Sequence, residues 1–118
     1  MSWIEHHSKS EQYAGDAEIA LRNQDLKRAQ ELYRLAAEYE TRALQYLDQS
    51  KMRTLSITAV SATSLWYKSK EYQKAQQVAY RCLGTGALMP FAVEQLQSLL
   101  QFIWNESAIE QVGGDCVL

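Results

Sequence analysis

Apolar residues recur along this chain at steps of three and four, which is the spacing of one face of an amphipathic α-helix. Short polar or glycine-containing breaks interrupt this pattern four times. After a short leader helix or turn at 3–7, the first main helix is expected to start near Ser8 or Ser10. Four more helices are predicted at 26–47, 52–66, 72–83 and 90–104. The pattern therefore predicts five main helices.

The segment 52–66 also contains a pattern that is typical of a β-strand. Leu55, Ile57 and Ala59 alternate with serine and threonine, which is the period of a half-buried strand. This alternation stops after Ala59, whereas the helical spacing continues to Trp66. The longer pattern favours a helix, and its many small residues predict close contacts with neighbouring helices. Together with the other segments, it predicts an all-α fold class.

Residues at the helix ends support these boundaries. Asp25 can accept a hydrogen bond from a free backbone N–H at the start of the second helix. The Gly-Thr-Gly sequence at 84–86 is suited to a helix C-terminus, and Pro90 to the first turn of the next helix. Beyond the fifth helix the apolar pattern ends. We therefore expect one helical domain at 1–106, followed by a flexible C-terminal tail at 107–118.

One face of each helix supplies the predicted core. This core includes Leu21, Leu26 and Phe91, because each continues the apolar stripe of its helix. Glu38 and Glu40 are expected to be solvated carboxylates, although Glu40 lies near an apolar stripe. The helices would thus bury apolar side chains and leave their charges in water.

Two parts of the chain share one hairpin pattern, in which a polar turn joins two helices. Aligning Ala29 with Ala75 places the copies 46 residues apart. Three further pairs then coincide: Leu26 with Tyr72, Ala20 with Trp66, and Ala36 with Cys82. Because small residues recur at matching positions, we expect Ala29 and Ala75 to lie at helix–helix contacts.

This pattern resembles the tetratricopeptide repeat, and the resemblance covers most of residues 10–88. In that family, the two helices of a unit touch through small residues, and a bulky residue after the turn fills the gap. The matching positions are Ala17, Ala20, Ala29, Tyr33 and Ala36 in the first copy, and Trp66, Tyr72, Ala75 and Cys82 in the second. The resemblance implies antiparallel helical hairpins with the fifth helix as a C-terminal cap.

The chain departs from the family pattern in three respects. The usual period is about 34 residues, so one hairpin would be extended by about twelve. Gln24 and Glu71 replace the glycine of the turn, and the first copy lacks the proline that ends a repeat. The resemblance therefore implies a small, tetratricopeptide-like domain that pairing with another chain would complete.

The resemblance also implies where a partner would bind. In the family, the first helices of successive hairpins line a concave face that holds a peptide or a partner helix. In this register the face includes Glu18 and Arg22 from the first copy, and Ser64, Tyr67 and Lys68 from the second. We expect Tyr67 to be exposed, because its neighbour in the sequence takes the core position. The register also places Leu21 on this face, and the predicted partner-binding surface consists of Glu18, Arg22, Ser64, Tyr67 and Lys68.

Two functions from different classes follow from this surface and from the helix lengths. The first is a non-enzymatic adaptor, scaffold or regulatory module that binds a protein or peptide. Ala14 and Glu18 occupy the places where the family's carboxylate clamp has Lys and Asn, so binding of a C-terminal carboxylate in that mode is not expected. The alternative is a structural subunit that forms a homodimer or larger oligomer through the second and fifth helices.

The sequence contains no motif that is typical of catalysis or of cofactor binding. It has no glycine-rich phosphate loop, no nucleophile elbow, and no histidine after His7 to activate a serine. Adjacent residues of a helix point about 100° apart, so His6 and His7 are poorly placed to share a metal ion. We therefore expect no cofactor and no metal, and keep an enzyme only as a reserve hypothesis.

Composition and charge narrow the class of partner and the location. The net charge of the chain is −2, so it lacks the excess of positive charge that is typical of nucleic-acid-binding domains. Nucleic acid is therefore not the expected partner. No apolar run approaches the roughly 18 residues that a membrane span needs, and the first residues lack a signal-peptide pattern. Cys82 and Cys116 have no metal or redox spacing, so we expect a core thiol, a tail thiol and no disulfide. A cytoplasmic location is the expectation.

Overall fold

The computed structural model describes five α-helices. The described part of the chain contains no β-strand. The description covers the backbone of residues 2–115 and the side chains of residues 2–109. The helices are α1 (Trp3–Arg22), α2 (Leu26–Leu44), α3 (Met52–Lys68), α4 (Tyr72–Gly84) and α5 (Pro90–Asp115). The predicted all-α fold class is therefore confirmed.

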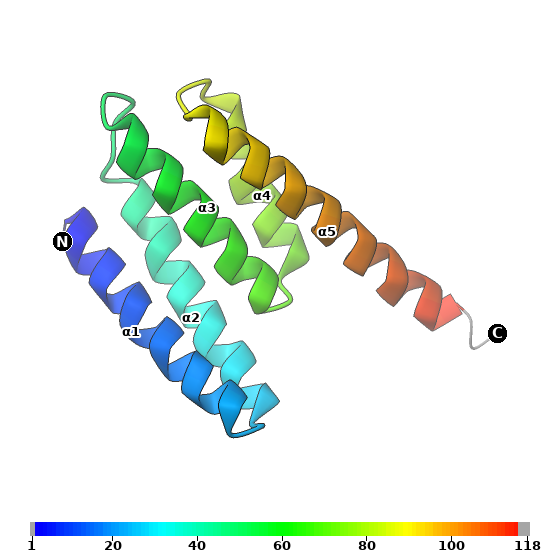
Figure 1. The fold of residues 1–118 in the computed structure, drawn as a ribbon. Coiled ribbons are helices and arrows are strands. Elements are labelled where there is room, and N and C mark those ends of the chain that lie inside the picture. The colour runs from blue at the N-terminus through cyan, green and yellow to red at the C-terminus, as the bar shows by residue number, and fades with distance from the viewer. Residues whose placement is uncertain (1, 116–118) are drawn as a thin grey trace.

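Consecutive helices pack against each other and run back and forth along one direction (Figure 1). α3 is the central element, because it contacts α2, α4 and α5, whereas α1 packs mainly against α2. The overall dimensions are 51 × 30 × 19 Å. Since one helix with its side chains is about 10–12 Å across, the smallest dimension corresponds to about two layers of helices. The C-terminal part of α5 extends past the other helices (Figure 1).

The first helix begins earlier than its apolar pattern predicts. The Ser2 side chain accepts a hydrogen bond from the backbone N–H of Glu5, and the Glu5 carboxylate accepts one from the backbone N–H of Ser2. This reciprocal capping box satisfies two backbone donors that a helix start leaves free. The leader expected at 3–7 is thus the first part of α1, and the starts predicted at Ser8 or Ser10 are wrong.

Two other boundaries differ from the prediction by three residues or more. α2 ends at Leu44 rather than at residue 47. α5 continues to Asp115, so residues 107–115 of the predicted tail are helical, while residues 116–118 lie outside the described residues. Residues 108–111 include the good helix formers Ala108, Glu110 and Gln111 and no proline, so helical propensity persists after the apolar stripe has ended, and the poor helix formers Gly113 and Gly114 lie only at the end of the helix.

The turn between α1 and α2 has a left-handed residue, Gln24, with a φ of 62°. The Gln24 N–H donates to the Leu21 carbonyl (3.0 Å), and the Asp25 N–H donates to the Ala20 carbonyl (2.9 Å). This pair of bonds is the Schellman motif that ends many helices. The Asp25 side chain then accepts from the Arg28 N–H at the start of α2, as predicted.

The turn between α3 and α4 repeats this geometry 46 residues later. Lys70 has a φ of 64°, and its N–H donates to the Tyr67 carbonyl (2.9 Å). The Glu71 N–H donates to the Trp66 carbonyl (3.0 Å). The residue that corresponds to Gln24 is therefore Lys70, and the assignment of that position to Glu71 is wrong.

Small residues form much of the core, as the hairpin pattern predicts. Ala29 and Ala75 are 2% and 0% exposed, and both belong to one continuous apolar core. Two buried polar residues of α3 bond to neighbouring segments: Ser56 accepts from the Met89 N–H, and Thr58 accepts from the Trp3 indole N–H. The close helix contacts predicted for this segment are therefore confirmed.

Three side chains assigned to the core are instead exposed. Leu21 is 48% exposed, Leu26 is 65% exposed and Phe91 is 37% exposed. Each of these side chains continues the apolar stripe of its helix. However, no other helix in the described part of the chain packs over it completely. Cys82 is buried as predicted, and burial raises the pKa of its thiol. Cys116 lies outside the described residues.

Candidate functional site

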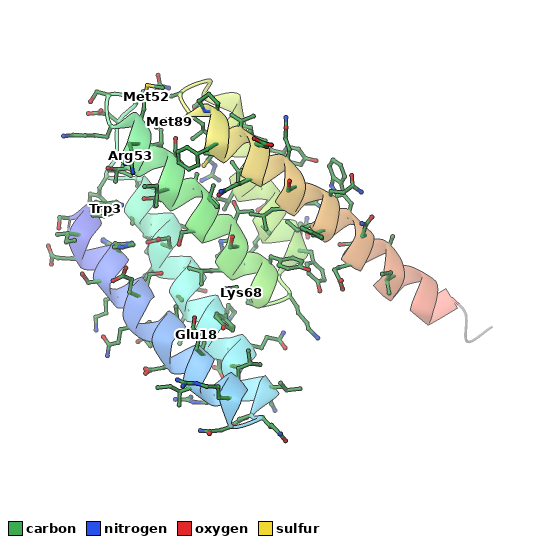
Figure 2. The ribbon with its side chains drawn as sticks, viewed as in Figure 1. Trp3, Glu18, Met52, Arg53, Lys68 and Met89 are labelled. Carbon is green, nitrogen blue, oxygen red and sulfur yellow. The ribbon has the colours of Figure 1, made fainter. Side chains whose placement is uncertain are left out.

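A groove with a volume of about 590 Å³ lies at the end of the molecule where α1 and α3 terminate. Four segments line it: the last turns of α1, the first half of α2, the end of α3 and the α3–α4 turn. Figure 2 labels one residue on each side of it, Glu18 on α1 and Lys68 on α3. Its volume lies within the range of about 300–1,000 Å³ that is typical of ligand pockets.

The apolar part of the groove comes from Leu21, Leu26, Ala29 and Tyr33. Ala29 and Tyr33 are buried and belong to the core, whereas Leu21 and Leu26 are about half exposed or more. The groove floor is therefore continuous with the core, and its two leucines present apolar surface to solvent. Such surface is what a partner could remove from water.

The polar part of the groove carries three cations, Arg22, Lys68 and Lys70, and one carboxylate, Glu18. The Lys68 ammonium lies over the ring of Tyr33, 5.5 Å from its centroid, which is a cation–π distance. Burial raises the pKa of the Tyr33 hydroxyl, and the nearby charge of Glu18 raises it further. Tyr33 is thus a neutral anchor for Lys68.

The predicted partner-binding surface divides into separate places. Glu18, Arg22 and Lys68 line the groove together. Ser64 instead lines a shallower hollow of about 520 Å³ between α3 and α5. Tyr67 is half-buried and contacts the ring of Tyr72, so the expectation that Tyr67 is exposed is wrong. The ring contact explains this, because the first aromatic residue of α4 covers Tyr67.

Of the other groove residues, only Leu21 was also placed on the predicted concave face, whereas Leu26 and Lys70 were not assigned to a surface. Leu21 and Leu26 were expected in the core, because periodicity shows which face of a helix is apolar and not whether another helix covers it. Lys70 was treated as part of a polar turn. Its available signal was its position 46 residues after Gln24, where the tetratricopeptide-like pattern expects glycine.

The other cluster of ionisable groups ties α1 to α2. His7 Nδ1 lies 2.9 and 3.2 Å from the two carboxylate oxygens of Glu40, and His7 Nε2 lies 3.0 Å from Glu11. Trp3 stacks on the His7 ring, with centroids 4.7 Å apart. Glu40 is 1% exposed, so the expectation that it is solvated is wrong. Its burial is compensated by His7, which the sequence places on another helix.

The interactions of this cluster indicate a structural role, in which His7 and Glu40 hold α1 against α2. Burial lowers the pKa of His7, while the hydrogen bond and charge of Glu40 and the interactions with Glu11 raise it, and the pKa lies above its ordinary value of 6.5. Both ring nitrogens face carboxylates, so neither is directed at an open site. Among the described residues, no group of three or more potential ligands could hold a metal ion.

Comparisons with known proteins found no family model, no curated protein and no solved structure that matches this chain. Across the described residues, every helix is too short or too polar to cross a membrane. The candidate function is therefore argued from the groove itself.

Proposed function

We propose that this protein is a non-enzymatic interaction module that binds a peptide segment or helix of a partner protein in the groove between α1, α2 and α3. The observation that carries the proposal is the exposure of Leu21 and Leu26 beside a charged rim. Protein interfaces combine an apolar centre with a polar border, and this groove has both. An adaptor or regulatory protein would bind its partner at such a site without catalysing a reaction.

The hairpin pattern supports the same proposal. The two turns with identical backbone geometry place the ends of α1 and α3 at one end of the molecule (Figure 1). In the tetratricopeptide family, which the sequence resembles, the first helices of the hairpins line the binding face. Here α1 contributes Glu18 and Arg22, and α3 contributes Lys68. Ser64 and Tyr67 are not part of this groove, so the proposed surface is smaller than the sequence alone suggests.

Leu26→Gln is the variant that tests this function. Because Leu26 is 65% exposed and lies at the first position of α2, the change should leave the fold intact. Burying a leucine side chain in an interface contributes about 1.5–3 kcal/mol, so the variant should bind a captured partner at least about tenfold more weakly. The measurement is affinity capture from the native source, followed by titration of the captured partner.

Ile57→Gln provides the matched control. Ile57 is 48% exposed on α3, and it is not among the groove residues. This variant should bind as the wild type does, while circular dichroism shows both variants to be helical. If Leu26→Gln binds as tightly as the control, the groove is not the binding surface.

The alternative function, a structural subunit that self-associates, is favoured by a different observation. The described part of α5 exposes four large apolar side chains, Phe91 (37%), Phe102 (57%), Trp104 (45%) and Ile109 (64%). The apolar stripe of α2 is largely covered by α1 and α3, so a seam between copies would come from α5. Size-exclusion chromatography with light scattering separates the two functions, because only the alternative requires a stable oligomer.

A further inference from the structure

We propose that the groove selects an acidic peptide segment, in which carboxylates flank a bulky apolar side chain. This inference rests on the proposed function and adds the chemistry of the partner. The apolar side chain would contact Leu21 and Leu26, and the carboxylates would face Lys68, Lys70 and Arg22. The evidence is the local charge, the backbone at Lys70 and the position of Lys68.

The local charge of the groove is opposite to that of the whole chain. The chain has 14 acidic and 12 basic side chains, with a net charge of −2. The groove brings together three cations and one carboxylate. The ion pairs within the described part of the chain involve none of Arg22, Lys68 and Lys70. Their charges are therefore available to an anionic partner, which a complementary interface would favour over a basic one.

Lys70 occupies a backbone position that suits a residue without a side chain. Its φ of 64° is left-handed, a conformation in which glycine is the common choice at the end of a helix. A lysine at this position is disfavoured for the fold, but it places a cation at the rim of the groove. The matching residue of the first turn, Gln24, has the same backbone and no charge, so the second turn alone places a cation at the groove.

Lys68 is held in place before a partner arrives. Its ammonium lies over the ring of Tyr33, which is itself 6% exposed and packed in the core. A positioned cation loses less conformational freedom on binding than a mobile one. The α1 side of the groove carries both Glu18 and Arg22, whereas the charged lining residues on the α3 side are Lys68 and Lys70, so an acidic segment would direct most of its carboxylates toward the α3 side. The groove thus sets the orientation of the segment as well as its charge.

The test uses three fluorescein-labelled synthetic peptides that have the same single leucine at their centre. Their remaining positions are glutamate, glutamine or lysine, and binding to the full chain is measured by fluorescence polarisation at low and moderate salt. The glutamate peptide should bind about tenfold more tightly than the glutamine peptide, and the lysine peptide more weakly than both. Added salt should reduce the difference, because exposed charges are screened.

Lys70→Gln removes one rim charge and keeps the turn, because Gln24 has the same left-handed backbone in the first turn. This variant should weaken binding of the glutamate peptide by about fivefold and leave the glutamine peptide unchanged. Lys51→Gln is the matched control: Lys51 is exposed at the opposite end of α3 and does not line the groove. It should bind all three peptides as the wild type does.

The outcomes separate the two proposals. If the glutamine peptide binds as tightly as the glutamate peptide, and Leu26→Gln abolishes both, the groove function stands and the acidic selection is overturned. The selection also fails if Lys70→Gln and Lys51→Gln have equal effects. If none of the peptides binds, or if binding of the glutamate peptide survives Leu26→Gln, both the selection and the proposed groove function fail.

Discussion

At the scale of single residues, the most informative feature is the buried pair of His7 and Glu40. A carboxylate that is 1% exposed is costly to bury unless another group compensates for its charge. His7 does so with Nδ1, while its Nε2 lies beside Glu11 at the more exposed side of α1. The pair therefore holds the N-terminal half of α1 against α2, and it makes this contact sensitive to protonation.

The stability of the fold should depend on the protonation of His7. The pKa of His7 lies above 6.5 in the folded state, because Glu40 and Glu11 outweigh the effect of burial. Between 6.5 and the raised pKa, the folded state binds more protons than the unfolded state. The contribution of this pair is therefore complete below pH 6.5 and is lost as the pH rises through the raised pKa.

Glu40→Gln tests this dependence. The variant should lower the pKa of His7 in an NMR titration, flatten the decrease of stability above pH 6.5, and cost about 3 kcal/mol near pH 6. Glu38→Gln is the control, since Glu38 pairs with Arg34 on the surface of α2 and should change stability only slightly. A His7 pKa at or below 6.5 in the wild type would contradict the assignment.

At the scale of the elements, the two hairpins share a turn and a set of small contact residues. The matching Schellman turns follow from local hydrogen bonds, and each reverses the chain at the same point of the pattern. Ala29 and Ala75 then lie at equivalent buried places. The absence of a large side chain at these positions lets the helices approach closely. What the two hairpins share at these positions is therefore a small side chain and not a particular functional group.

Ala75→Leu should overpack the second hairpin. Ala75 is 0% exposed, so the added carbon atoms must displace neighbours, at a cost of about 1–3 kcal/mol. Thermal denaturation followed by circular dichroism measures the effect. Gln77→Leu adds a similar side chain to the exposed face of α4 and should change the melting temperature little. A neutral Ala75→Leu variant would show that the site is more open than its burial indicates.

At the scale of the whole molecule, the helices form an extended stack in which most contacts join neighbours in the sequence. α3 is covered by three helices, whereas α1 and α5 lie at the two ends of the stack (Figure 1). In a stack of this kind, the helices at the ends can unfold locally while the central helix stays folded. The groove lies near one of these ends, where α1 supplies one of its sides.

Native-state hydrogen exchange should therefore differ between the helices. We expect the backbone amides of α3 to exchange most slowly, because they open only when contacts to α2, α4 and α5 are lost. The amides of α1 should exchange faster, and Glu40→Gln should accelerate them further by removing the contact with His7. Equal protection of α1 and α3 would show that the stack unfolds as a single unit.

The sequence alone determined the number of helices, the fold class and the register of the two hairpins. These features are local: the three-and-four apolar spacing, the cap at Asp25 and the left-handed glycine at residue 86 act within a few residues of the chain. It also indicated that Glu18, Arg22 and Lys68 share one side of the fold, and these three residues do line one groove.

Only the tertiary structure decided which apolar and charged positions are covered. Leu21 and Leu26 belong to apolar stripes, but they lie where the stack leaves a groove and so face solvent. Glu40 lies on a helix that could have exposed it, but His7 from α1 makes its burial possible. Helical periodicity fixes the direction of a side chain around its own axis. Whether another element meets that side chain depends on how the helices are stacked.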